Sequence, residues 1–251
     1  MKQLSLSLRL WRHLFGTVLT LVSIGLPLRA DDQEKPAGTQ WTIIAECQMV
    51  VVSQKLAWPL LPDLNDDEKI EGAWAKLQQM IERGDATLVA NLSLRGDPGK
   101  RMVAEQIQEI RYPTEFTPPY LPDAIPKEHA VEALKNWPIV GITPTAFETR
   151  NVGATLELET KVSADGKWLA LEAVPQHVRL LRMVKIDAGI LPSGKHLSLE
   201  QPYFSALKDT LTMHLRAGQR VLVGLHKVPA EENNMELFFL RIRTQAEQRG
   251  E

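Results

Sequence analysis

The sequence predicts a mainly β fold, a β-rich α+β domain in which antiparallel sheets and hairpins pack with one amphipathic helix. Most of the chain consists of alternating apolar and polar segments bounded by turn residues, and one stretch alone has helical periodicity. The alternation is clearest after residue 152, where Leu156, Leu158 and Val162 fall on one strand face and Glu157 and Glu159 on the other. This pattern indicates a half-buried antiparallel strand.

The first 30 residues have the pattern of a secretory signal peptide. Lys2, Arg9 and Arg12 form a basic start, residues 14–26 are apolar, and Ala30 is a small residue at the expected cleavage position. The apolar run is shorter than the roughly 20 residues of a membrane-spanning helix, so we expect cleavage, with an uncleaved anchor as the alternative. Residues 31–40 are polar and contain proline and glycine, which predicts a flexible leader.

Residues 41–52 are rich in isoleucine and valine and predict a buried strand. Its cysteine, Cys47, lies inside the apolar run and is the chain's single cysteine, so we expect a buried, unreactive thiol and no internal disulfide. A helix follows, with Asn65 or Asp66 as its cap and Gly84 at its end. Its apolar residues recur at helical spacing and predict packing on the sheet, or, less favoured, binding to a partner: Ile70, Ala73, Trp74, Leu77, Met80 and Ile81.

Two further strands are expected at residues 86–94 and 101–110, joined by a turn that contains glycine and proline. Residues 112–144 carry many prolines, which disfavours a central strand and long helices. We therefore expect a surface excursion there, interrupted at most by a short helix at residues 127–136.

The strand after residue 147 folds back at the dipeptide Asp165-Gly166, because glycine adopts the positive φ that tight hairpin turns require. A second arm runs from residue 168 to 184, and its Arg179 and Arg182 are expected on a solvated face. After a predicted loop at residues 186–200, three more strands are expected at residues 203–215, 220–228 and 235–244, followed by a polar tail at residues 245–251.

Composition and charge exclude some classes of function. Without the four basic residues of the signal peptide, 25 lysines and arginines face 31 acids, a net charge of −6, which argues against a nucleic-acid partner. No pair of histidines has metal-ligand spacing, and no nucleophile-elbow or phosphate-loop motif occurs. For His214 and His226 we expect a polar contact across the last hairpin. We therefore predict no enzyme activity and no catalytic, cofactor or metal site.

Several segments share a pattern of alternating strands and glycine turns: Ile44-Ala45-Glu46, Val152-Gly153 through Gly166, Thr210 to Leu225, Glu236 to Leu240, and the stretches at residues 111–119 and 144–153. Together these segments are similar to the C-terminal domain of bacterial secretins, the outer-membrane channels of type II and type III secretion and type IV pilus systems. The similarity covers most of residues 41–244. It departs from the family in lacking space for the ring-building modules that normally precede this domain, and in having Val223-Gly224-Leu225 where Gly-Gly-Leu is usual.

The resemblance implies a non-enzymatic structural component of protein secretion, exported to the periplasm or outer membrane of a Gram-negative-type bacterium. Its partners would be further copies of itself in a ring, envelope or secretion-complex proteins, and the outer membrane. One alternative is a soluble periplasmic binding or scaffold domain without a pore, and a disfavoured one is a periplasmic hydrolase. The residues expected to shape the turns and strand junctions are Gly153, Gly166, Gly218 and Gly224.

Overall fold

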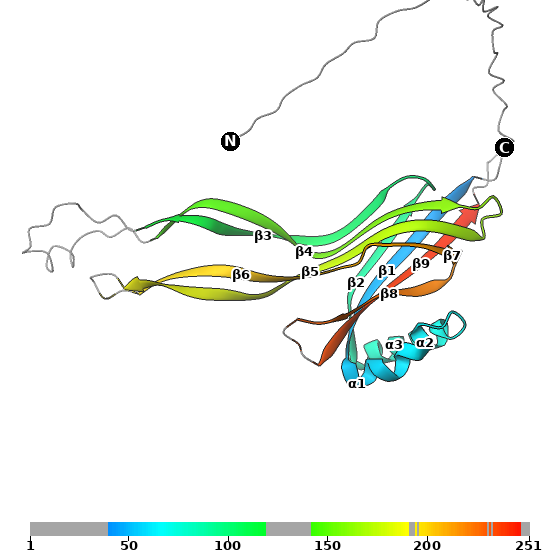
Figure 1. Cartoon of the computed structure of the whole chain (residues 1–251), viewed down its shortest axis with the longest axis horizontal. Helices are drawn as coiled ribbons and strands as arrows, with labels where there is room; N and C mark the ends of the chain where they lie inside the picture. Colours follow the sequence, from blue (N-terminus) through cyan, green and yellow to red (C-terminus); the bar gives the residue numbers. More distant parts are fainter. Residues whose placement is uncertain are drawn as a thin grey trace, which may run out of the picture. The chain divides into compact units, whose positions relative to one another are not determined.

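The computed structural model describes residues 40–118, 142–190, 194, 196–229, 231 and 233–246. In this part the chain is mainly β, with two antiparallel sheets and one group of helices, so the predicted fold class is confirmed (Figure 1). The predicted signal peptide, the leader up to residue 39, the short helix at residues 127–136 and the end of the tail lie outside the described residues.

The first sheet, sheet A, has four strands in the order β2-β1-β9-β8. All neighbouring strands in it are antiparallel, and β1 pairs with β9 along its whole length. The central pair therefore joins the beginning and the end of the described chain. The strands are β1 (Trp41–Ser53), β2 (Ala86–Gly96), β8 (Arg220–Lys227) and β9 (Asn234–Ala246).

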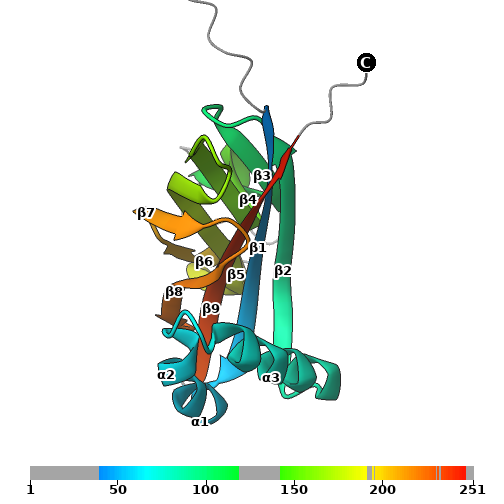
Figure 2. The same ribbon diagram turned by 90° about the vertical axis from the view of Figure 1, so that its right-hand side faces the viewer.

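Helices pack against one end of sheet A, on the face away from the main core, as Figure 2 shows. The longest, α3 (Ile70–Arg83), ends at Gly84, whose φ of 81° is the left-handed conformation expected of a glycine C-cap. Trp74 of α3 meets Phe239 of β9 edge to face with a ring-centroid distance of 4.9 Å, so the amphipathic helix packs on the sheet as predicted. Shorter helical segments precede it: α1 (Gln54–Ala57), η1 (Trp58–Leu60) and α2 (Leu61–Leu64).

The second sheet, sheet B, has the order β3-β4-β5-β6, and β7 pairs with the same edge of β5 as β6. The hairpin between β4 and β5 turns at residues 163–167, where Gly166 has a φ of 72°. Its strands are β3 (Met102–Thr117), β4 (Thr143–Val162), β5 (Trp168–Ile190), β6 (His196–Lys208) and β7 (Leu211–Arg216).

The two sheets pack face to face and enclose the main hydrophobic core. Alternate residues of β1 and β9 meet alternate residues of β4, β5 and β7. Cys47 is among them with no exposed surface, and burial raises the pKa of its thiol to about 12. The largest fully buried side chains of this core are Ile43, Met49, Leu156, Leu158, Leu169, Phe238, Leu240 and Ile242.

The strands of sheet B extend further than the sequence indicated. β3 continues to Thr117 and β4 starts at Thr143, so both ends of the expected proline-rich excursion are strand. The pairing of β4 with β5 stops at Gly153, and beyond it β3 and β4 form a two-stranded ribbon. Pro113 lies in a strand with a free edge and a register shift, where a missing N–H removes no central ladder bond.

The prediction of a loop at residues 186–200 is also wrong. β5 runs to Ile190 and β6 begins at His196, so most of this segment belongs to a second ribbon. A register shift between Asp187 and Gly189 lets the strand continue, with the carboxylate of Asp187 accepting a hydrogen bond of 2.9 Å from the Gly189 N–H. The strand expected at residues 203–215 is divided into β6 and β7 by Asp209 and Thr210.

Candidate functional site: strand edges and an inter-sheet polar cluster

The four glycines predicted to shape turns and strand junctions lie at positions with different constraints. Gly166 is in the β4–β5 turn, and a Cβ there would come within 2.4 Å of the Trp41 ring. Gly218 is in the turn between β7 and β8 with a φ of 88° and open space around it. Gly153 is inside β4 rather than at a turn, with a φ of 129°, and a Cβ would lie 2.1 Å from the carbonyl oxygen of Gln106. Close backbone approach therefore requires glycine at residue 153.

Gly224, in the middle of β8, lies against an acid that comes from sheet B. A Cβ at this position would lie 2.1 Å from Oδ2 of Asp209 and 3.1 Å from Nε2 of His226. The strand has a register shift between Leu222 and Gly224, so an irregular strand and a missing side chain coincide here.

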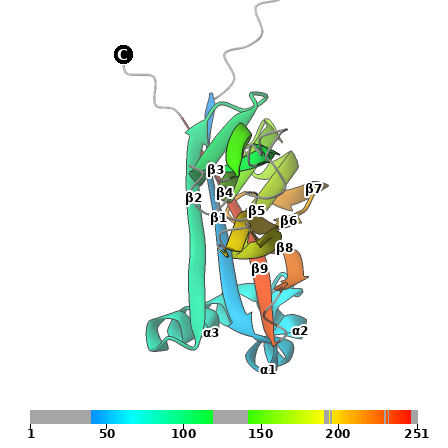
Figure 3. The same cartoon turned by 90° about the vertical axis from the view of Figure 1, so that its left-hand side faces the viewer.

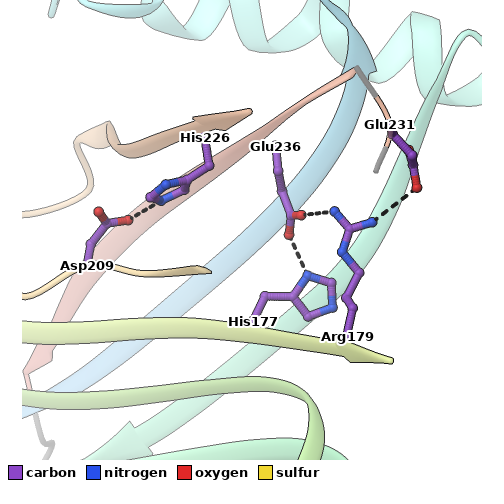
Figure 4. Close-up of polar contacts among 6 residues, drawn as sticks. All are labelled: His177, Arg179, Asp209, His226, Glu231 and Glu236. Carbon is purple, nitrogen blue, oxygen red and sulfur yellow. Dashed lines mark hydrogen bonds and ion pairs between the residues drawn. The ribbon is translucent and has the colours of Figure 1, made fainter. Parts of the chain in front are cut away.

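A buried polar cluster joins sheet B to sheet A beside the hydrophobic core (Figure 4). Glu236 of β9 has no exposed surface, and its Oε1 is 2.5 Å from Nδ1 of His177 of β5. Arg179 donates a hydrogen bond of 2.6 Å to Oε2 of the same carboxylate and also lies 3.5 Å from Glu231. Both oxygens of the buried carboxylate are thus satisfied by β5, as a buried charge requires.

This cluster corrects the expectation that Arg179 lies on a solvated face. Its side chain is only 19% exposed, whereas Arg182 is exposed and lies over the ring of Tyr203 at 5.1 Å. One feature of the sequence indicates this cluster. Glu236 is the single acid in the apolar run Met-Glu-Leu-Phe-Phe-Leu. A carboxylate at a core-facing position of such a strand needs a cationic partner.

A second polar contact between the sheets involves His226 of β8, whose Nε2 lies 2.8 Å from Oδ2 of Asp209. The expected contact of His226 with His214 across the last hairpin is wrong, because β7 belongs to sheet B and β8 to sheet A. His214 instead faces a surface hollow with Glu159 and Glu172.

The geometry offers no support for hydrolytic chemistry. The imidazoles of His177 and His226 each have an acid within hydrogen-bond distance. Among the described residues, neither imidazole has a hydrogen bond to a serine or cysteine that could act as a nucleophile. Within the same residues, no three histidine, cysteine or acidic side chains converge as metal ligands. None of the helices described there is long and apolar enough to span a membrane.

Both sheets have unpaired strands on both sides. Among the described strands, nothing pairs with the outer edges of β2 and β8 in sheet A or with those of β3, β6 and β7 in sheet B. β2 leads directly into β3, so those two edges share one side, and the contact between Asp209 and His226 puts β8 and the β6–β7 edge together on the other (Figure 3).

The direction of the strands makes the two sides complementary. In sheet A, β8 runs in the same sense as β1 and opposite to β2, because each neighbouring pair is antiparallel. In sheet B, β6 and β7 likewise run opposite to β3. A second copy placed beside the first would therefore continue both sheets with antiparallel pairs.

Apolar side chains are exposed on these edges. β2, β3, β6 and β8 each carry one large hydrophobic residue with more than a third of its surface exposed: Leu88, Val103, Tyr203 and Leu225. β2 also lacks lysine, proline and acids along all its 11 residues. Charged residues and prolines are the usual protection of a free strand against association, and β2 carries only one such residue, Arg95.

The two ribbons of sheet B contact each other within one chain. The side-chain amide of Gln201 in β6 donates a hydrogen bond of 2.9 Å to the carbonyl of Pro113 in β3. Next to it the rings of Tyr112 and Phe204 lie 5.7 Å apart. Phe147 on β4 and Ile186 and Ile190 on β5 are exposed on the same ribbons.

Comparison with known proteins gives structural similarities without a family assignment. No family model matches the chain, and no curated protein does. Among solved structures, Aeromonas hydrophila ExeD is 13% identical with a TM-score of 0.38, over 84% of this chain and 49% of that one. The InvG secretin domain β-barrel of the Salmonella SPI-1 injectisome is 8% identical with a TM-score of 0.39, over 84% of this chain and 64% of that one. The type II secretion system secretin GspD of E. coli K12 is 13% identical with a TM-score of 0.34, over 84% and 51%.

This chain thus spans about half the length of the first of these structures.

Proposed function

We propose that this protein is a secretin-like component of a bacterial envelope that associates side by side with copies of itself and serves protein secretion across the outer membrane. In this proposal β8 and the β6–β7 edge of one copy pair with β2 and β3 of the next. Such an interface uses different surfaces of the two copies and generates a ring if the rotation between copies closes. The protein would be exported to the periplasm or outer membrane and would have no catalytic role.

The observation that carries this proposal is the edge of β2. A free edge strand with a single charged residue and no proline can pair with another strand unless it is covered, and β8 of a second copy has the matching direction. The sequence resemblance to secretin C-terminal domains points to the same kind of assembly. A periplasmic scaffold domain with the same fold and no ring is the alternative, and it predicts a stable single chain.

A charged residue on the β2 edge tests the pairing directly. Leu88→Lys places a positive charge on the edge at a position that is 38% exposed, so it should reduce self-association while leaving the fold intact. The matched control is Trp58→Lys, which removes a 55% exposed hydrophobic side chain from a helical segment and not from an edge.

Sedimentation velocity of the mature protein over a range of concentrations gives the readout. We expect a loss of the larger species in Leu88→Lys alone. Equal loss in both variants would indicate unspecific hydrophobic association, and no loss in Leu88→Lys would contradict pairing through β2.

A further inference from the structure

The edge strand of sheet B is interrupted at Asp209. β6 pairs with β5 up to the pair Gln176 and Lys208, and β7 pairs with β5 from Ala173 and Leu211 onward. Between them the Asp209 N–H still donates a hydrogen bond of 3.1 Å to the carbonyl of Pro175. The backbone therefore stays at the edge of sheet B, although the regular pairing with β5 is interrupted for two residues. The Asp209 side chain points away from sheet B.

The Asp209 carboxylate crosses to the edge strand of the other sheet (Figure 4). Its Oδ2 lies 2.8 Å from Nε2 of His226 on β8, and the two side chains are 25% and 21% exposed. The His226 ring packs on Phe238 of β9 with a centroid distance of 5.0 Å, which fixes the imidazole against the core. A hydrogen bond between a fixed imidazole and the carboxylate thus joins two edges that belong to different sheets.

The contact between Asp209 and His226 has room because residue 224 is a glycine without a side chain. A Cβ at residue 224 would overlap the Asp209 carboxylate, with 2.1 Å to Oδ2, and would press on the His226 imidazole at 3.1 Å. The backbone of β8 is therefore adapted to receive an acid from sheet B. Asp209, Gly224 and His226 form one unit, which we call the edge clasp.

The clasp ties together the two edges on this side, in addition to the hydrophobic core and the Glu236 contacts that hold the sheets. On the opposite side the chain itself connects β2 to β3 through residues 97–101. A second copy that pairs with both edges at once gains from their fixed spacing, because the second pairing becomes effectively intramolecular once the first has formed. Without the clasp, the two edge strands would be less restrained relative to each other, and restraining them during association would have an entropic cost.

We propose that Asp209 and His226 are positioning residues for self-association, which hold the β8 edge and the β6–β7 edge in register for a second copy of this chain. This inference rests on the proposed function and adds to it the residues that coordinate the two pairings. The side chains of Asp209 and His226 are partly exposed and lie beside the core. We therefore expect the clasp to contribute more to association than to the folding of one chain.

The test compares three variants of the mature chain with the unchanged protein. Asp209→Ala removes the contact, and Asp209→Asn keeps an oxygen that accepts the hydrogen bond from His226. Asp187→Ala is the control, because it removes an exposed acid whose hydrogen bond lies within one strand and does not connect the sheets. Association is measured by sedimentation velocity, folding by urea denaturation, and the β7 edge by hydrogen exchange.

For Asp209→Ala we expect an association midpoint about tenfold higher in concentration, the change that about 1.4 kcal/mol produces, with faster exchange in β7. Asp209→Asn should restore most of the association, and Asp187→Ala should match the unchanged protein. If Asp209→Ala does not fold, Gly224→Ala takes its place, since it keeps both polar groups but displaces the carboxylate.

Two outcomes would overturn these ideas separately. Association of Asp209→Ala at the unchanged midpoint would refute the positioning role while leaving the proposed function intact. An unchanged protein that stays a single chain at every concentration would refute the proposed function. In that case, an unchanged rate of hydrogen exchange in β7 of Asp209→Ala would also show that the clasp does not hold the two edges together.

Discussion

The guanidinium of Arg179 donates a hydrogen bond of 2.6 Å to the fully buried carboxylate of Glu236, and by this contact a strand of sheet B is fixed to the core-facing side of sheet A. His177 contacts the other oxygen of the carboxylate at 2.5 Å. The two sheets are therefore held by a specific polar contact as well as by hydrophobic packing, and this contact lies close to the start of the ribbons of sheet B. If the edges of both sheets are to pair with a second copy at the same time, the two sheets must keep a fixed position relative to each other.

Removal of the buried carboxylate should destabilise the fold strongly. Glu236→Leu leaves His177 without its acidic partner and Arg179 with the exposed Glu231 alone, and the loss of one member of a buried ion pair costs roughly 3–5 kcal/mol. Urea denaturation followed by tryptophan fluorescence measures the effect. Glu159→Gln, on an exposed position of β4, is the control and should change the free energy of unfolding by less than about 0.5 kcal/mol. A loss below about 1 kcal/mol in Glu236→Leu would contradict the assigned role.

Two glycine substitutions should have opposite effects. Gly72→Ala, in the first turn of α3 with no atom close to the new Cβ, should stabilise the protein by roughly 0.4–1 kcal/mol, because alanine reduces the conformational freedom of the unfolded chain. Gly153→Ala should destabilise it, since the residue has a φ of 129° and the Cβ would meet a carbonyl oxygen at 2.1 Å. Thermal unfolding of both variants gives the comparison. Equal melting temperatures would be inconsistent with the close approach of β3 and β4 at Gly153.

The thiol of Cys47 should react only after unfolding. Burial raises its pKa from the ordinary 9.0 to about 12, so almost no thiolate forms in the folded protein near neutral pH. Mass spectrometry after maleimide treatment, with and without urea, measures the reaction. Rapid labelling of the folded chain would show that this part of the core opens readily.

The same shift has a consequence for stability at alkaline pH. Because the folded pKa is raised, the unfolded chain loses the thiol proton first as the pH rises above 9.0. The contribution of Cys47 is therefore complete below this pH and decreases between pH 9.0 and 12. Cys47→Ala should show a smaller loss of stability over this range, and identical pH profiles of the two proteins would contradict the assignment.

The parts of the fold that depend on neighbouring residues were predictable from the sequence. The turn at Gly166 and the end of α3 at Gly84 follow from the positive φ that glycine permits. The burial of Cys47 follows from the apolar run around it. The strand in the proline-rich segment was not predicted, because the rule against proline applies to central strands and Pro113 lies in a ribbon with a free edge.

The contacts between the sheets could not be predicted in the same way. Asp209 and His226 are 17 residues apart and Arg179 and Glu236 are 57 apart, and no periodic pattern connects either pair. Gly153 was predicted as a turn or strand-junction position, but its sequence context does not show that the Gln106 carbonyl lies against it. Each of these features depends on how separate strands pack, which a single sequence does not specify.

The central claim of side-by-side association is tested most directly by the mass of the mature protein, residues 31–251. We would extract it in mild detergent, measure the mass by light scattering, and determine its distribution between soluble and membrane fractions. The account predicts a large assembly of many copies, which resists heat and is found with the outer membrane. A particle with the mass of one chain in the soluble fraction would contradict it and would favour a periplasmic binding or scaffold domain.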